Sequence, residues 1–224
     1  TEISNPEVNM DVVKLEKPPK IAVYSPKTKK PWDDAVTLVL TYAEIPYDLI
    51  YDEDVLQEKL LKYDWLHLHH EDFTGQYGKF YGQRFEPWYQ QQVRDMEAQA
   101  KALGFNKVSE EKLAVAKKVR DYCAGGGFLF AMCSATDSYD IALAAEGVDI
   151  CESMFDGDGA DPNPKLDYSH CFAFQNFTLF SDPNFYEYST IDTYHPRQRK
   201  YNQSNDLFTL FQFSAKWDPV PTML

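Results

Sequence analysis

The stretch formed by residues 125–137 constrains the fold more than any other part of the chain. Three glycines end a predicted helix, and the apolar residues 128–132 follow them without a polar interruption. A short apolar run of this kind is typical of a strand that is covered on both faces in the middle of a parallel sheet. The strand ends on Cys133, and we expect Asp137 to cap a helix that continues to about residue 146.

Cys133 stands at the apex of this strand, turn and helix. The pattern is that of a nucleophile elbow, whose tight turn requires small neighbours such as Ala131 and Ala135. A thiol at a helix N-terminus faces the positive end of the helix dipole, which favours the thiolate. The alternative is a buried cysteine that ends a core strand, because free cysteine packs as a small hydrophobe. The local sequence leaves both interpretations open.

Strands and helices alternate along the first two thirds of the chain. We expect strands at 20–25, 47–51 and 64–70, helices at 31–44, 56–62, 88–103 and 109–124, and a long loop at 71–87. This order predicts an α/β fold of three layers, in which a mostly parallel, flavodoxin-like sheet has helices on both faces. Further β segments are expected in the C-terminal third, at 171–180 and 207–213. Residues 1–19 are expected to form an N-terminal arm, and residues 20–224 a single domain.

The net charge and the spacing of the cysteines restrict which partners and metal sites the chain is expected to have. The formal net charge of −13 repels the phosphates of nucleic acids and anionic membranes, so neither is an expected partner. No apolar run reaches the length of a membrane span. The four cysteines form no CxxC pair, which argues against a zinc ribbon and gives no disulfide framework. The acidic segment 156–163 lacks the spacing of a calcium loop and favours a solvated loop. We therefore expect no cofactor and no metal.

Reacting groups in such sheets gather beyond the carboxyl ends of the strands, where the loop 69–78 would face the Cys133 turn. A cysteine nucleophile needs a base and N–H donors for the developing oxyanion. The candidate catalytic residues are Cys133, His69, His70 and Glu71. The candidates for oxyanion or substrate binding are Ser134, Gly75, Gln76, Tyr77 and Asp137. The histidine pair is equally typical of a strand end that meets solvent.

Four segments carry a resemblance to a known family. The sequences IAVYSP (21–26), PWDDAVTLVLTY (31–42), WLHLHHEDFTGQYG (65–78) and FAMCSATD (130–137) resemble a bacterial family labelled asparagine synthetase B. The resemblance extends from about residue 20 to the end of the chain. It implies a class I glutamine amidotransferase-like fold near the ThuA-like proteins, and an exported protein, periplasmic or secreted.

The resemblance also bears on the catalytic base. In class I glutamine amidotransferases, a His-x-Glu pair later in the chain completes the catalytic triad with the cysteine. Here His195 is followed by Pro196 and Arg197. Full-length members of the labelled family have a later Gly-His-Asp-Pro-Glu segment, so the resemblance implies that the missing histidine and glutamate lie beyond residue 224. We therefore expect a domain that is truncated at its C-terminus.

Two functions follow from these features. The first is a cysteine-dependent, glutaminase-like amide or acyl hydrolase of unknown substrate. The alternative is a catalytically inactive module that binds a carbohydrate or a protein partner through the aromatic loop 73–88. Asparagine synthetase activity is not supported, because the chain opens on Thr1 rather than on a cysteine and has no Ser-Gly-Gly loop.

Overall fold

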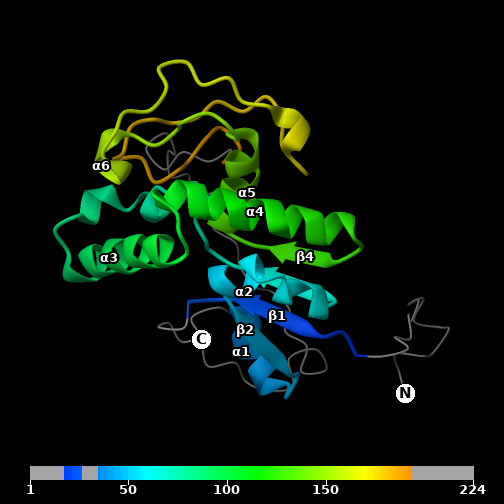
Figure 1. The fold of residues 1–224 in the computed structure, drawn as a ribbon. Coiled ribbons are helices and arrows are strands. Elements are labelled where there is room, and N and C mark those ends of the chain that lie inside the picture. The colour runs from blue at the N-terminus through cyan, green and yellow to red at the C-terminus, as the bar shows by residue number, and fades with distance from the viewer. Residues whose placement is uncertain (1–17, 27–34, 193–224) are drawn as a thin grey trace, which may run out of the picture. The chain divides into compact units, whose positions relative to one another are not determined.

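A computed structural model describes residues 18–26 and 35–192 of the protein (Figure 1). Within these ranges, four strands, all parallel, form one sheet in the order β2-β1-β3-β4. The strands are β1 (Ile21–Tyr24), β2 (Tyr47–Ile50), β3 (Trp65–Leu68) and β4 (Phe128–Ala131). The prediction of an α/β fold with a parallel sheet is therefore confirmed.

Most helices fall close to where the sequence predicts them, whereas those at 52–56 and 153–156 were not expected. They are α1 (Ala35–Tyr42), α2 (Asp52–Leu56), α3 (Pro87–Ala102), α4 (Val108–Ala124), α5 (Ser134–Ala144) and α6 (Ser153–Asp156). Short 3-10 helices lie at Lys59–Lys62, Tyr77–Lys79, Tyr81–Gln83 and Tyr168–His170. None of the helices in the described ranges is both long enough and apolar enough to cross a membrane.

Proline and glycine set two of the helix ends. Pro87 begins α3, where its missing N–H costs no hydrogen bond. Gly125 ends α4, and Gly127 lets the chain pass the ring of Tyr122, which a side chain at 127 would strike. The chain can therefore turn directly from α4 into β4.

Helices pack on both faces of the sheet. On one face, α2, α4 and α5 build the main core against side chains that include Tyr24, Leu66 and Leu68. On the other face, Leu40 of α1 packs against Ile21 and Val23 of β1. Burial of these apolar side chains is the main source of stability, at about 1.5–3 kcal/mol for each fully buried large residue.

The expectation that β4 is covered on both faces is wrong for the described residues. There β4 pairs only with β3, and Phe128 and Phe130 remain 57% and 41% exposed. The two rings lie edge-on to Trp65 of β3. They stay exposed because α1 covers β1, and no other described helix lies on that face of the sheet.

The expected β segment at 171–180 is also wrong as a strand. Its β structure is limited to an isolated antiparallel bridge between Leu179 and Ser189. The segment lies beside α5 (Figure 1), where the Asp140 carboxylate accepts hydrogen bonds from the N–H groups of residues 172, 173 and 174 at 2.8–2.9 Å. These N–H groups therefore have a carboxylate partner and need no neighbouring strand. The segment expected at 207–213 and His195 lie outside the described residues.

Candidate functional site at the Cys133 turn

Cys133 lies directly after β4 and is the N-cap residue of α5, with φ 50° and ψ −139°. Residues with a side chain rarely adopt positive φ, and such conformations cost about 1–3 kcal/mol and cluster at functional sites. Cys133 is solvent-exposed. The strand, strained turn and helix are those of a nucleophile elbow, so the backbone geometry expected from the sequence is present at this residue.

Helix α5 begins earlier than the sequence predicts. It starts at Ser134, so the cap is Cys133 and not Asp137. The backbone N–H groups of Ala135 and Thr136 are bonded to the carbonyls of Met132 and Cys133. Ser134 supplies the first backbone N–H of the helix, at the position from which an elbow donates to an oxyanion.

The histidine loop begins beside the Cys133 turn. The register pairs Leu68 with Ala131, and the N–H of Met132 donates to the Leu68 carbonyl, so the chains leave β3 and β4 together. The rings of His69 and His70 are 4.2 Å apart. The N–H of His69 donates to the Glu71 carboxylate at 2.6 Å.

Ser138 fixes the loop to α5. Its hydroxyl donates to the Glu71 carbonyl at 2.8 Å and accepts a hydrogen bond from the N–H of Phe73 at 3.3 Å. The structure thus brings the loop of His69, His70 and Glu71 to the helix that carries Cys133.

The other loop candidates contact different elements. Gly75 has φ +83°, and a Cβ there would lie 2.7 Å from the backbone of Ser109 at the start of α4. Gln76 is buried, and its carbonyl accepts a hydrogen bond from the N–H of Lys79. Tyr77 is buried in a second core with Tyr89 of α3. Their role in oxyanion or substrate binding stays a prediction, while their local contacts shape the loop.

Asp72 holds the loop in shape. One of its carboxylate oxygens accepts from the N–H and the hydroxyl of Thr74, at 2.7 and 2.6 Å. The other accepts from the N–H of Gly78 at 2.8 Å. Because the carboxylate is buried, these hydrogen bonds replace the water that it loses.

Lys79 connects the loop to a distant part of the chain. The residue is 3% exposed, and its ammonium group donates to the carbonyls of Phe180 and Glu187, at 2.7 and 2.9 Å. Burial lowers the pKa of Lys79 to about 8, against the opposing effect of carboxylates such as Asp72 and Asp137. A buried cation thus anchors the segment 180–187 over the elbow.

This segment brings Tyr186 near Cys133. The pKa of Tyr186 is raised, first by burial and then by the nearby Cys133 thiol and Asp137 carboxylate. Sequence reasoning did not single out Tyr186. The only local signal is the group of three aromatic residues within 185–188. The sequence does not show that this group packs near Cys133, more than fifty residues earlier in the chain.

Asp137 lies one helical turn after Cys133 on α5. Its side chain is 8% exposed and accepts a hydrogen bond from the N–H of Ser138. The pKa of Asp137 is raised to about 6, mainly by burial and to a smaller extent by the charges of Asp192 and Asp72. The sequence named Asp137 as a cap and a binding candidate, and the structure makes it a buried acid next to the elbow.

A row of aromatic rings leads away from the elbow. Tyr186 packs against Phe80 with ring centroids 5.4 Å apart, and Phe80 meets Trp88 edge-on at 5.6 Å. Tyr186 and Trp88 are 44% and 45% exposed. Exposed aromatic faces such as these can hold a flat or apolar part of a ligand.

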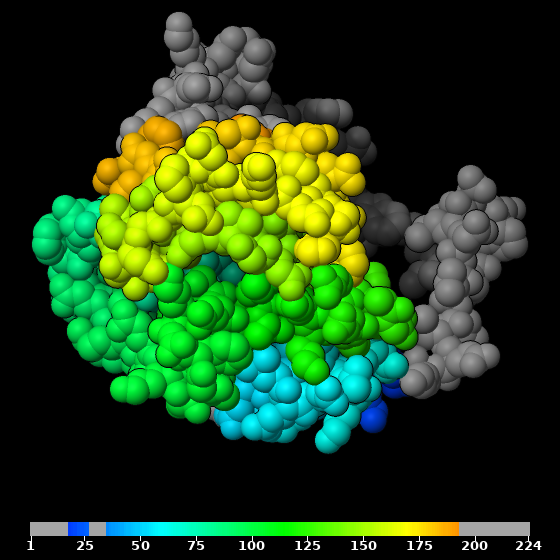
Figure 2. Space-filling view, turned by 45° about the horizontal axis from the view of Figure 1, so that its top comes forward, coloured from blue at the N-terminus to red at the C-terminus, as the bar shows by residue number. Residues whose placement is uncertain are grey.

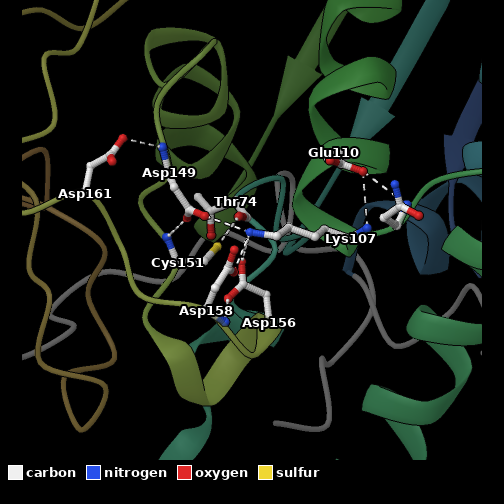
Figure 3. A network of polar contacts seen from close by, with 9 residues as sticks. Thr74, Lys107, Glu110, Asp149, Cys151, Asp156, Asp158 and Asp161 are labelled. Carbon is white, nitrogen blue, oxygen red and sulfur yellow. Dashed lines mark hydrogen bonds and ion pairs between the residues drawn. The ribbon is translucent and has the colours of Figure 1, made fainter.

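A second polar cluster surrounds Lys107 (Figure 3). The Lys107 ammonium contacts the carboxylates of Asp149, Asp156 and Asp158 at 2.8, 3.0 and 2.5 Å. Ligand atoms of Asp149, Cys151 and Asp156 lie within 4.8 Å of one another and could hold a metal ion. The Lys107 ammonium already contacts both carboxylates of this set. Burial raises the pKa of the Cys151 thiol, which donates to the Thr74 carbonyl, whereas a metal ligand must be a thiolate. The cluster therefore suits the Lys107 ammonium better than a metal ion.

A cavity of about 230 Å³ opens beside this cluster, between α4 and the chain after α5. Its walls include Phe73, Ser109, Leu113, Ile150 and Cys151. Figure 2 shows the hollow between the green surface of α4 and the yellow-green surface above it. Cys133 is not among the residues that line it, so the cavity and the elbow are separate features.

Comparisons with protein-family models, with curated proteins and with solved structures find no match for this chain.

Proposed function

We propose that the protein is a cysteine-dependent hydrolase of amide or acyl bonds, in which Cys133 is the nucleophile. The observation that carries the proposal is the backbone of Cys133, a non-glycine residue at φ 50° and ψ −139° between a parallel strand and a helix. A buried cysteine that ends a core strand has no need of this strained conformation. The exposure of Cys133 also argues against that alternative.

The elbow supplies the parts of an acyl transfer. The sulfur of Cys133 would attack the substrate carbonyl carbon, and the carbonyl oxygen would take up the electron pair as an oxyanion facing the N–H of Ser134. The leaving group would depart with a proton and leave a thioester, which water then hydrolyses. His69, His70 and Glu71 begin the facing loop, from which they would orient the substrate.

The finer fold assignment belongs to the same proposal. We infer a flavodoxin-like, class I glutamine amidotransferase-like domain, related to the family labelled asparagine synthetase B. The parallel order β2-β1-β3-β4 and the position of the nucleophile after β4 support this assignment.

A small activated ester tests the proposal without knowledge of the substrate. We expect p-nitrophenyl acetate to give a burst of p-nitrophenolate that is stoichiometric with protein, and peptide mass spectrometry to find the acetyl group on Cys133. Cys133→Ala should abolish the burst. Cys171→Ser is the matched control, because Cys171 is a half-buried thiol on another segment, and it should leave the burst unchanged. Acetylation of Cys133 no faster than in the urea-unfolded chain would contradict the proposal.

The aromatic row supports a second candidate, a binding module for a carbohydrate or a protein partner. Its exposed rings would stack on a sugar or on apolar side chains. Glycan-array or pull-down binding that survives Cys133→Ala and is lost on Trp88→Ala would support this function. A protein that acylates Cys133 but binds no glycan and no protein would contradict it.

A further inference from the structure

We propose that the cavity between α4 and the chain after α5 binds a small primary amine with an apolar body, such as an arylalkylamine. The apolar body would fill the interior of the cavity, and the ammonium group would lie among the carboxylates at its mouth. The inference goes beyond the proposed function, because Cys133 is not among the residues that line this cavity.

The interior wall of the cavity is mainly apolar. Phe73 and Ala142 are buried there, and Leu113 and Ile150 are half-buried. An apolar cavity of roughly 150 Å³ takes up a benzene molecule, so one of about 230 Å³ has room for about nine non-hydrogen atoms. The interior therefore fits a single ring with a short side chain.

Lys107 lines the mouth of the cavity, but its ammonium is not available to an anion. It donates to the carboxylates of Asp149 and Asp158 at 2.8 and 2.5 Å and forms an ion pair with Asp156 at 3.0 Å (Figure 3). An ammonium group has three N–H donors, and here three carboxylates surround it. No other lysine or arginine is among the described residues that line the cavity.

Glu110 adds a fourth carboxylate at the mouth. Four carboxylates and one ammonium give a formal net charge of −3 around Lys107. Glu110 accepts the N–H groups of Asn106 and Lys107 with Oε2, at 3.1 and 3.3 Å, while its Oε1 accepts no hydrogen bond from the described residues. The mouth thus offers a ligand surplus negative charge and an open carboxylate oxygen, which favour a cation.

The interior and the mouth together select a ligand that is apolar at one end and cationic at the other. A neutral aromatic molecule would fill the interior without using the charge. An aromatic acid would place a carboxylate among carboxylates. An amine gains charge-assisted hydrogen bonds, which are roughly twice as strong as neutral ones. Ligand pockets commonly combine apolar walls with a few polar groups that orient the ligand, as this cavity does.

A series of three ligands of similar size tests the choice of charge. Phenethylamine, phenethyl alcohol and phenylacetate are a cation, a neutral molecule and an anion at pH 7, and each is titrated into the full chain by calorimetry. We expect one amine to bind per chain, about tenfold more tightly than the alcohol, and the acid not to bind. Equal affinity for the amine and the alcohol, tighter binding of the acid, or no binding of the amine would overturn the proposal.

Leu113→Trp tests the location of the site, because the larger side chain would occupy the interior. Amine binding should be lost in this variant. The matched control is Leu61→Trp, since Leu61 is 70% exposed and does not line the cavity, and this variant should bind the amine like the wild type. Thermal unfolding checks that both variants are folded. Amine binding that is unchanged in folded Leu113→Trp would show that the amine binds elsewhere and would overturn the proposal.

Lys107→Met separates a site for a cation from a site for an anion. Removing the ammonium leaves its carboxylates to the ligand, so amine affinity should rise about tenfold, whereas a site that used Lys107 to hold an anion would lose affinity. Lys101→Met on the surface of α3 is the control. Weaker amine binding in folded Lys107→Met would contradict the proposal.

Glu110→Gln provides a second charge variant that does not depend on how Lys107→Met folds. Glutamine keeps the acceptor for the two N–H groups at the start of α4 and removes the charge. Amine affinity should fall about two- to fivefold, as expected for a partly exposed ion pair, and Asp121→Asn on the surface of α4 should leave it unchanged. Equal amine affinity in Glu110→Gln and the wild type would contradict the ion contact. Because every readout is amine binding, none of these failures bears on acylation of Cys133.

Discussion

The conformation of Cys133 is the residue-scale feature on which the proposed function depends. A residue with a side chain occupies backbone angles that glycine adopts easily, and the structure keeps it there between β4 and α5. Such strain persists where the surrounding fold enforces it, and it is common at reactive groups. The strain can be measured separately from any reaction.

We predict that Cys133→Gly stabilises the protein by about 1 kcal/mol, because glycine relieves the strain at positive φ. Cys133→Ala removes the same sulfur but keeps the strain, so it should change the free energy of unfolding by much less. Urea unfolding of the two variants measures the difference. Equal stabilities would show that the turn is not strained.

Gly75 allows a close approach between the histidine loop and α4. It combines φ +83° with a position where a Cβ would lie 2.7 Å from the backbone of Ser109. We predict that Gly75→Ala destabilises the protein by about 1–3 kcal/mol, since neither backbone can move away cheaply. Gly82→Ala on the same loop meets open space and serves as the control in thermal unfolding. A similar small effect at both positions would contradict the close approach.

At the scale of elements, the segment 171–192 separates what the sequence predicts from what it does not. Strands β1 to β4 and helices α3 to α5 were predictable because their apolar residues recur with the period of one secondary structure. The segment after Cys171 is equally apolar, but it takes its hydrogen bonds from Asp140 and Lys79, which lie 31 or more residues away. No local pattern shows such partners, so the sequence suggested strands there and missed Tyr186.

The same reliance on local patterns explains which parts of the Cys133 site were predictable. Cys133 and the histidine loop were predictable as neighbours, because parallel strands end at the same edge of a sheet. The cap role expected for Asp137 was wrong, because α5 begins four residues earlier, with Cys133 as its cap. In the folded chain Asp137 is instead a buried carboxyl group with a raised pKa. Burial depends on the tertiary structure and could not be predicted from the local sequence.

Lys79 should decide whether the Tyr186 segment stays in place. We predict that Lys79→Met, which keeps the length of the side chain and removes its donors, costs about 1–3 kcal/mol by leaving the two carbonyls without a partner. It should also increase hydrogen exchange at residues 180–188. Lys101→Met, on the exposed surface of α3, is the control. Exchange that is unchanged at 180–188 would show that Lys79 does not anchor the segment.

At the scale of the whole molecule, a buried polar network connects three helices. Lys112 of α4 forms an ion pair with Asp52 of α2 at 2.6 Å, and both side chains are almost fully buried. Gln99 of α3 donates to the neighbouring Glu111 at 3.2 Å. The pKa of Glu111 is raised to about 8, mainly by burial and then by the charge of Asp52.

This network makes stability depend on pH. Folded Glu111 keeps a proton that the unfolded chain loses above about pH 4.5, so its contribution is complete below that pH and is lost as pH rises to about 8. We predict that Glu111→Gln, which cannot lose a proton, gains stability relative to wild type between pH 5 and pH 8. Urea midpoints at the two pH values measure this gain. A constant difference between the two proteins would contradict it.

The relative reactivity of the four thiols tests the central claim most directly. Cys133 is exposed at a helix N-terminus, whereas burial raises the pKa of Cys123 and Cys171 to about 11 and that of Cys151 further still. With limiting iodoacetamide at pH 7, peptide mass spectrometry should find Cys133 alkylated first, and faster than in the urea-unfolded chain, with Cys151 last. If Cys133 reacts no faster folded than unfolded, the turn does not present a reactive nucleophile.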